Sequence, residues 1–165
     1  MVYRFDPMDE ASARAIFQWR YGPPYEVYNL DSADLEDELQ LFLDPAHAYH
    51  RITDEGGNLV AYCCFGAEAQ VPGGDYGQEA LDVGMGVRPD LTGQGRGLGF
   101  VGAVLDFAAG MFAPAMYRVT VAQFNQRALR VWEKAGFRPV QTFARSGDGM
   151  SFVILARPVQ HRREE

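Results

Sequence analysis

Hydrophobic residues recur along this chain with two different periods, and each change of period marks the limit of a structural element. Alternating residues at 2–5 predict a short strand, and apolar positions on one helical face predict a helix over residues 8–19. Residues 35–42 repeat with a helical period and predict a second helix, which we expect Asp31 or Ser32 to cap. The N-terminal third is therefore expected to hold one strand and two helices.

The middle of the chain changes to the alternation that is typical of strands. Residues 47–53 and 59–65 flank a Gly-rich turn and are predicted to pair as a hairpin. A further strand over residues 80–87 is interrupted by Gly84 and Gly86. Glycine inside a strand often marks a bulge or a place where a ligand approaches the backbone, which makes this strand a candidate part of a binding site.

Helical and strand periods alternate through the rest of the chain, and the tail from about residue 158 is expected to be flexible. The predicted elements are a helix from near Arg96 with apolar positions to Phe112, a strand over 116–121, a helix over 125–135, and strands over 137–143 and 151–156. This order predicts a single α/β domain over residues 1–165, with helices on both faces of one sheet.

Composition narrows the classes of protein to which the chain can belong. Its 47% hydrophobic content fills one core without disulfides or metals, and the adjacent Cys63 and Cys64 face opposite sides of a strand, so they are not expected to pair. The net charge of −7 disfavours a nucleic acid partner, because phosphate binding needs clustered Lys and Arg. The chain has neither an apolar run of membrane-spanning length nor a signal-peptide pattern, so we expect a cytoplasmic protein without a membrane partner.

A Gly-rich segment, Gln94-Gly95-Arg96-Gly97-Leu98-Gly99, lies between the strand that ends at Val87 and the following helix. The first N–H groups of a helix lack internal partners and carry partial positive charge, so a turn with few Cβ atoms before them favours an anion. Arg96 adds a charged fork, and a pyrophosphate is the natural ligand. A flexible turn whose glycines serve packing is the alternative, and the well-patterned helix that follows disfavours it.

Two other phosphate-binding motifs fit this segment poorly. A dinucleotide-binding fingerprint, Gly97-Leu98-Gly99-Phe100-Val101-Gly102, begins inside the predicted helix, and no acidic residue follows at the distance that would hold a ribose. A Walker A loop needs Gly-Lys-Ser/Thr at its end, which this segment does not have.

The segment resembles the Q/R-x-x-G-x-G/A signature of the GNAT superfamily of acetyltransferases, and Val87-Arg88-Pro89-Asp90 before it resembles the end of that family's fourth strand. A second stretch, residues 119–137 with Asn125, Ala128 and Trp132-Glu133-Lys134-Ala135-Gly136-Phe137, resembles the family's Asn-x-x-Ala…Tyr-Glu-Lys-x-Gly-Phe. Two motifs in the right order and spacing are strongly specific. The resemblance implies the acyl-CoA N-acyltransferase fold: one mixed, mostly antiparallel sheet with splayed fourth and fifth strands.

The resemblance also implies that acetyl-CoA, as co-substrate, binds between the splayed strands. Its pyrophosphate would bind the N–H groups of residues 95–99, with Gln94 as part of the motif, and its pantetheine would run beside Val87. Gly84 and Gly86 would form the bulge that family members carry there. Asn125 would contact the cofactor arm, and it is equally well placed as a helix N-cap.

Acyl transfer to an amine needs a neutral amine, a polarised thioester carbonyl and an outlet for the charge of the thiolate. In the family a carboxylate on the fourth strand often accepts the proton of the amine, and Asp82, then Glu79, are placed for that role. A charged residue on a solvated strand face is an equally good interpretation of Asp82.

One position departs from the family pattern. The tyrosine that commonly protonates the leaving thiolate is replaced by Trp132, whose indole N–H is too weak an acid. A nearby tyrosine, a water molecule or no dedicated acid remain as alternatives. Thr120 stands where some protein N-terminal acetyltransferases have a glutamate base, which argues against that subclass.

The acceptor side is less specified. The loop between the first two helices is rich in tyrosine, and Tyr25 and Tyr28 are candidates for the wall of an acceptor pocket, although packing at the helix corner would select the same residues. The histidines and cysteines lack metal-ligand spacing, so no metal is predicted.

Two functions are compatible with these patterns. The first is an N-acetyltransferase that acts on a primary amine of a small molecule or peptide. The second is a catalytically silent acyl-CoA-binding module, which the tryptophan at position 132 favours. A homodimer is left open.

Overall fold

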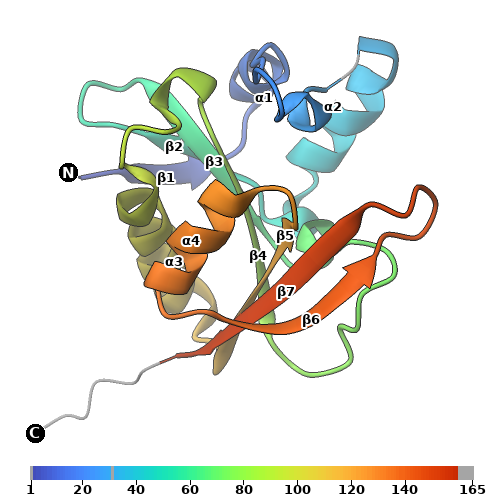
Figure 1. Ribbon diagram of the computed structural model, residues 1–165. Coiled ribbons are helices and arrows are strands. Elements are labelled where there is room, and N and C mark those ends of the chain that lie inside the picture. The colour runs from blue at the N-terminus through green and yellow to red at the C-terminus, as the bar shows by residue number, and fades with distance from the viewer. Residues whose placement is uncertain (1, 31, 160–165) are drawn as a thin grey trace, which may run out of the picture.

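The computed structural model describes residues 2–30 and 32–159, and within them the elements follow the predicted order (Figure 1). The elements are β1 (Arg4–Pro7), α1 (Glu10–Phe17), α2 (Leu35–Leu43), β2 (His50–Thr53), β3 (Leu59–Phe65), β4 (Leu81–Val87), α3 (Gly97–Phe112), β5 (Met116–Ala122), α4 (Gln126–Lys134), β6 (Arg138–Ala144) and β7 (Ser151–Pro158). The agreement shows that hydrophobic period alone was enough to place each element.

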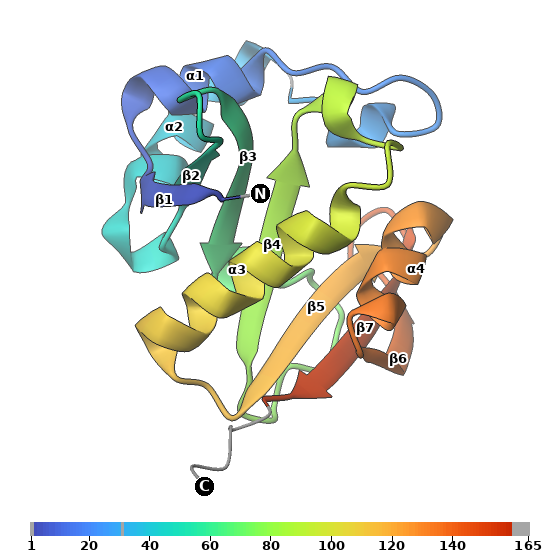
Figure 2. The same ribbon diagram turned by 90° about the vertical axis from the view of Figure 1, so that its left-hand side faces the viewer.

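The strands form one sheet in the order β1-β2-β3-β4-β5-β7-β6. Neighbouring strands are antiparallel except β4 and β5, which run parallel and pair only at Leu81–Tyr117, Asp82–Arg118 and Val83–Val119. Beyond Val83 the two strands separate (Figure 2). The prediction of a mixed, mostly antiparallel sheet with splayed fourth and fifth strands is therefore confirmed.

Helices cover both faces of this sheet and build two apolar clusters. On one face, α3 packs its buried residues Phe100, Val101 and Val104 against the central strands (Figure 2). On the other face, α1 and α2 pack around Phe17 and Phe42. β3 contributes to both clusters: Ala61, Cys63 and Phe65 belong to the first and Tyr62 to the second, because side chains along a strand alternate between faces. In the same way Cys63 and Cys64 are buried on opposite faces as free thiols, so the prediction that they do not pair is confirmed.

The starts of α2 and β2 differ from the prediction. A 3₁₀ turn over Ser32–Asp34 precedes α2, whose N-cap is Asp34 rather than Ser32; Asp31 lies outside the described residues. A second 3₁₀ turn, Pro45–His47, delays the start of β2 to His50. Most of the tail that was expected to be flexible, residues 160–165, also lies outside the described part of the chain.

The bulge expected in β4 is wrong. The pairing of β4 with β3 runs from Ala61–Val87 to Phe65–Val83 without a shift of register. The glycines of β4 instead make room for side chains of β3 that lie across the strand. A Cβ on Gly86 would lie 2.4 Å from the ring of Tyr62, and one on Gly84 would lie 2.8 Å from the sulfur of Cys64.

This close approach predicts a specific loss of stability. Gly86→Ala should lower the free energy of unfolding by about 1–3 kcal/mol, because the new methyl overpacks the Tyr62 ring. Gly102→Ala adds the same methyl on α3 where nothing lies within 4 Å, and alanine favours helix, so this control should be as stable as the parent or more stable. Urea denaturation measures both, and equal midpoints for the two variants would show that Tyr62 does not need the glycine.

Candidate functional site

A cavity of about 620 Å³ opens where β4 and β5 separate. Its walls are the second half of β4, the second half of β5, the turn before α3, one side of α4 and the loop between α1 and α2. Residues from both faces of β4 line it, with Val83 and Met85 on one face and Gly84 and Gly86 on the other. The cavity therefore passes through the thickness of the sheet.

The main chain of β4 directs hydrogen-bonding groups into this cavity. Arg88 N–H donates to the Val60 carbonyl and Gly66 N–H donates to the Asp82 carbonyl, both at 2.9 Å, so the even-numbered residues of β4 bond to β3. The N–H and C=O groups of Met85 and Val87 therefore point away from β3, toward the side from which β5 has withdrawn. An extended ligand in the gap would meet them as it would meet a neighbouring strand.

The Gly-rich turn forms the end of the cavity at the N-terminus of α3. Gly93 and Gly95 adopt left-handed φ angles of 72° and 73°, which glycine accommodates without strain, and the helix begins at Gly97. The first N–H groups of α3, from Gly97 onward, have no carbonyl partner within the helix. The turn thus has the geometry of an anion site at a helix N-terminus.

The cavity includes half of the predicted motif. Gly95, Gly97 and Leu98 line it, together with Thr92 and Gly93, which the sequence analysis did not include. The other three predicted residues are outside the lining: the side-chain amide of Gln94 donates to the Asp90 carbonyl at 2.8 Å, Arg96 stacks on Phe100, and Gly99 lies on the exposed side of the helix. If the same six-residue pattern of alternating glycines is placed two residues earlier, it begins at Thr92 and includes Gly93, Gly95 and Gly97. These four residues all line the cavity.

Two cations of α4 also line the cavity and were not predicted. Arg127 and Lys134 lie on the side of α4 that faces the turn. Between them, Val131 packs against Gly97, where a Cβ would lie 3.1 Å from its side chain, and Arg127 makes an equally close approach to Gly93. Their positive charges add to that of the helix N-terminus. Their helical spacing was visible in the sequence, but it does not reveal which face of α4 meets the turn.

The loop between α1 and α2 crosses the opening of the cavity and is attached to both walls. The Tyr21 hydroxyl donates to the Val87 carbonyl at 2.7 Å, and Asn125 donates from its side chain to the Tyr28 hydroxyl at 3.1 Å. Tyr25 packs under the guanidinium of Arg127 at 4.4 Å. The structure therefore brings the predicted acceptor residues Tyr25 and Tyr28 together with the predicted cofactor residues Val87 and Asn125.

Asn125 is the N-cap of α4 and also lines the cavity, while its predicted contact with the cofactor arm stays a prediction. Its side-chain oxygen accepts from Ala128 N–H at 3.1 Å and caps α4, while its nitrogen faces the cavity and Tyr28. The capping role fixes the orientation of the amide, so its nitrogen is the atom presented to the cavity.

Burial keeps the hydroxyls of Tyr21, Tyr28 and Tyr62 protonated. It raises the pKa of Tyr21 to about 12, and it raises the pKa of Tyr28 and Tyr62 above their usual range. At neutral pH these phenols are therefore hydrogen-bond donors rather than bases. Trp132 also lines the cavity, buried with its ring edge-on to Phe137.

The carboxylates predicted as bases lie elsewhere. Glu79 is exposed in the loop before β4. Asp82 is 3% exposed and lies outside the cavity lining, with both carboxylate oxygens bound by the guanidinium of Arg118. The role of Asp82 as a base stays a prediction, and this ion pair argues against it. Among the described residues that line the cavity, none is Asp or Glu.

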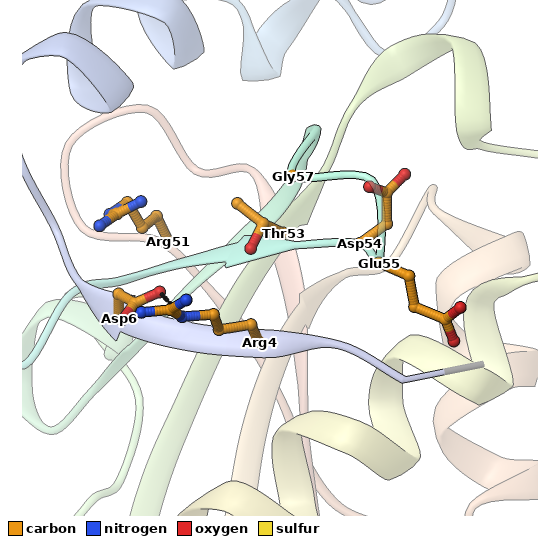
Figure 3. A pocket seen from close by; sticks show the side chains of 7 residues that line it. All are labelled: Arg4, Asp6, Arg51, Thr53, Asp54, Glu55 and Gly57. Carbon is orange, nitrogen blue, oxygen red and sulfur yellow. Dashed lines mark ion pairs between the residues drawn. The ribbon is translucent and has the colours of Figure 1, made fainter.

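A second, smaller hollow of about 330 Å³ lies beside β1 and the turn between β2 and β3 (Figure 3). Its side chains carry both charges, and Arg4 forms an ion pair with Asp6 at 2.9 Å. Because its charges offset one another at the surface, this hollow offers no convergent set of groups for chemistry. In the described residues no group of His, Cys, Asp and Glu could hold a metal ion, and no helix is long and apolar enough to cross a bilayer.

Comparison with known sequences supports the resemblance. The sequence profile of the Acetyltransferase (GNAT) family matches residues 13–137, which include the cavity walls from β4 to α4. None of the curated protein sequences compared with the chain matches it.

Solved structures of N-acetyltransferases share the fold. A chimera of the Vibrio cholerae spermidine N-acetyltransferase and hSSAT superposes with a TM-score of 0.73 at 16% identity, over 94% of this chain and 95% of that one. A candidate phosphinothricin N-acetyltransferase superposes with a TM-score of 0.72 at 18% identity, over 97% and 100%. The Vibrio cholerae spermidine enzyme in complex with CoA and spermine superposes with a TM-score of 0.68 at 16% identity, over 94% and 95%. At these identities the likeness establishes the fold alone.

The turn before α3 can be tested with one charge placed at two positions. Gly97→Asp sets a carboxylate inside the cavity, and we expect it to weaken CoA binding by roughly 100-fold or more, because like charges at a binding site cost several kcal/mol. Gly99→Asp carries the same charge two residues further on, outside the lining, and should lose much less. Isothermal titration with CoA measures both, and unchanged affinity in Gly97→Asp would contradict the site.

Proposed function

Because the chain belongs to the Acetyltransferase (GNAT) family, we propose that it transfers the acetyl group of acetyl-CoA to a primary amine of a small-molecule or peptide acceptor. The family identifies an acetyl-CoA-dependent N-acyltransferase, and the acceptor is the part that we infer. The observation that carries the proposal is the gap between β4 and β5, where main-chain groups of a strand and the N-terminus of a helix meet in one cavity.

The proposed cofactor site follows the charges and main-chain groups of that gap. The pyrophosphate would bind the glycine turn and the first N–H groups of α3, where Gly95, Gly97 and Leu98 line the cavity. The pantetheine would lie along β4 and pair with the main chain of Met85 and Val87, as a strand would. Gln94, Arg96 and Gly99 do not line the cavity, and their predicted contacts with the pyrophosphate stay predictions.

The proposed reaction joins the amine nitrogen to the acetyl carbon and breaks the carbon–sulfur bond. A main-chain N–H of Met85 or Val87 would polarise the carbonyl as its oxygen becomes anionic. The proton of the amine would leave through water, because the described lining has no carboxylate to accept it. A protonated tyrosine hydroxyl, that of Tyr28 above all, would supply a proton to the thiolate. It would take the role of the usual tyrosine, whose position in this chain is occupied by Trp132.

The acceptor is the least determined reactant. The tyrosines at the opening offer aromatic faces and hydroxyl groups to the body of the amine. The neighbours in structure are named for spermidine, a polyamine, and for phosphinothricin, an amino acid, so their names do not agree on one class of acceptor. We therefore propose Tyr25 and Tyr28 as acceptor contacts without naming the amine.

A catalytically silent acyl-CoA-binding module is the second candidate, and Trp132 at the position of the usual acid favours it. A panel of monoamines, polyamines, amino acids and short peptides, assayed with acetyl-CoA for release of free thiol, separates the two. We expect turnover with at least one primary amine and none with the form in which every primary amine is acetylated. Tight binding of acetyl-CoA without turnover on any amine would instead establish the silent module.

Tyr28→Phe tests the acceptor wall. This variant keeps the ring and removes the hydroxyl that bonds to Asn125. We expect the KM for the amine to rise roughly two- to tenfold, the worth of one hydrogen bond, and we expect kcat to fall as well, because the proposed proton donor to the thiolate is lost. Tyr3→Phe is the control. Tyr3 stacks on Phe100 but does not itself line the cavity, so its hydroxyl is not expected to contact the amine. A fall in kcat at constant KM would assign the hydroxyl to protonation of the thiolate, and unchanged kinetics would exclude both roles.

A further inference from the structure

Asp82 and Arg118 face each other across the short parallel contact of β4 and β5. They are the middle of the three residue pairs that join these strands before the gap opens. Arg118 binds the carboxylate through two parallel hydrogen bonds, Nε to Oδ1 at 2.6 Å and Nη2 to Oδ2 at 2.7 Å. Both residues are buried, with 3% and 6% exposed.

The loop that precedes β4 adds two further hydrogen bonds to the pair. The side-chain amide of Gln70 donates to Asp82 Oδ2 at 2.8 Å, and Arg118 Nη1 donates to the Gln78 carbonyl at 3.0 Å. The ring of Tyr76 covers the guanidinium at 4.9 Å. Three hydrogen bonds thus occupy most of the lone-pair sites of the carboxylate, and its burial outside the cavity lining keeps it away from a substrate in the cavity.

The same network reaches the cavity at one point. The Tyr76 hydroxyl lies 2.8 Å from the hydroxyl of Thr120, a residue of β5 that lines the cavity two positions after Arg118. The Tyr76 oxygen also accepts from Val71 N–H at 2.9 Å. The ion pair, the loop and the cavity wall on β5 are therefore held together through Tyr76.

The Asp82–Arg118 pair could serve to stabilise the fold or to position β4 and β5, and its location favours positioning. A buried ion pair is weak evidence for stability, because desolvation offsets the attraction between its charges. It is nevertheless directional, and here it fixes two strands that share only three residue pairs at the position where they begin to diverge. A change of spacing at this point would be passed to the whole gap beyond it.

We propose that Asp82 is a positioning residue, which acts through Arg118 to set the separation of β4 and β5 and the place of Thr120, and that it does not take the proton of the amine. This inference rests on the proposed acetyl transfer for its kinetic consequence. Its structural consequence, the stability of the gap, does not depend on turnover.

The test compares Asp82→Asn, Arg118→Gln and the double variant. If the pair positions the strands, each single variant loses kcat/KM by a similar factor, on the order of 100-fold, and the double variant is no worse than either. The acidic limb of the pH profile of kcat/KM keeps its shape in all three. Asp148→Asn, which opens the exposed pair with Arg145, is the control and should leave the kinetics unchanged.

Hydrogen–deuterium exchange gives a readout that needs no substrate. We expect the single variants to speed exchange in residues 81–87 and 116–122 relative to the parent and to Asp148→Asn, and we expect the double variant, which buries no lone charge, to do so least. Unchanged exchange at these strands would overturn the proposal, whether or not the protein turns over. The proposal would also be overturned if kcat/KM fell only in Asp82→Asn and in the double variant, and if the acidic limb of their pH profiles became flat. That result would identify Asp82 as the base. An inactive parent that binds acetyl-CoA would refute the acetyl transfer alone.

Discussion

The site depends on how briefly β4 and β5 pair. Each strand keeps its other neighbour along its length, β3 for β4 and β7 for β5, so the two can separate while each remains part of the sheet. Main-chain groups that a neighbouring strand would satisfy thereby face the cavity, where the Tyr21 hydroxyl already binds one of them, the Val87 carbonyl. Such groups are costly inside a protein unless something binds them, and a ligand with its own amide groups satisfies them best.

Several details of the sequence follow from this one separation. Gly84 and Gly86 have no side chain because those of Cys64 and Tyr62 cross the strand there, and this places the Tyr62 ring beside the gap. Gly97 is small because α4 packs against the start of α3 through Val131. The glycines of this chain thus serve three different purposes: close packing of side chains, approach of a helix, and left-handed turns.

The order of elements and the glycine turn could be predicted from the sequence because each depends on local pattern. The residue at which the glycine motif begins could not be determined in the same way. Glycines at alternate positions allow the motif to be read from Thr92 or from Gln94, and only the start of α3 decides between them. The N-cap of α2 was misplaced for a similar reason, since Ser32 and Asp34 are both good capping residues.

Residues that meet across the sheet were the hardest to foresee. Asp82 was predicted as a base on its position in one strand, but its partner Arg118 is 36 residues away in the chain and is brought to it by the parallel register. The contacts of Tyr21 with Val87 and of Tyr28 with Asn125 join segments that are further apart still. Patterns within one element predict its type, whereas such pairings depend on how the elements are assembled.

The cavity runs through the sheet rather than into one surface, because residues from both faces of β4 line it. The turn and α4 approach it from the face that α3 covers, while Gly84, Gly86 and Tyr62 belong to the opposite face. The cavity thus presents groups from both faces of the sheet to whatever it binds. The buried thiols of Cys63 and Cys64, whose pKa values burial raises, are not part of its lining and are suited to packing rather than to nucleophilic attack.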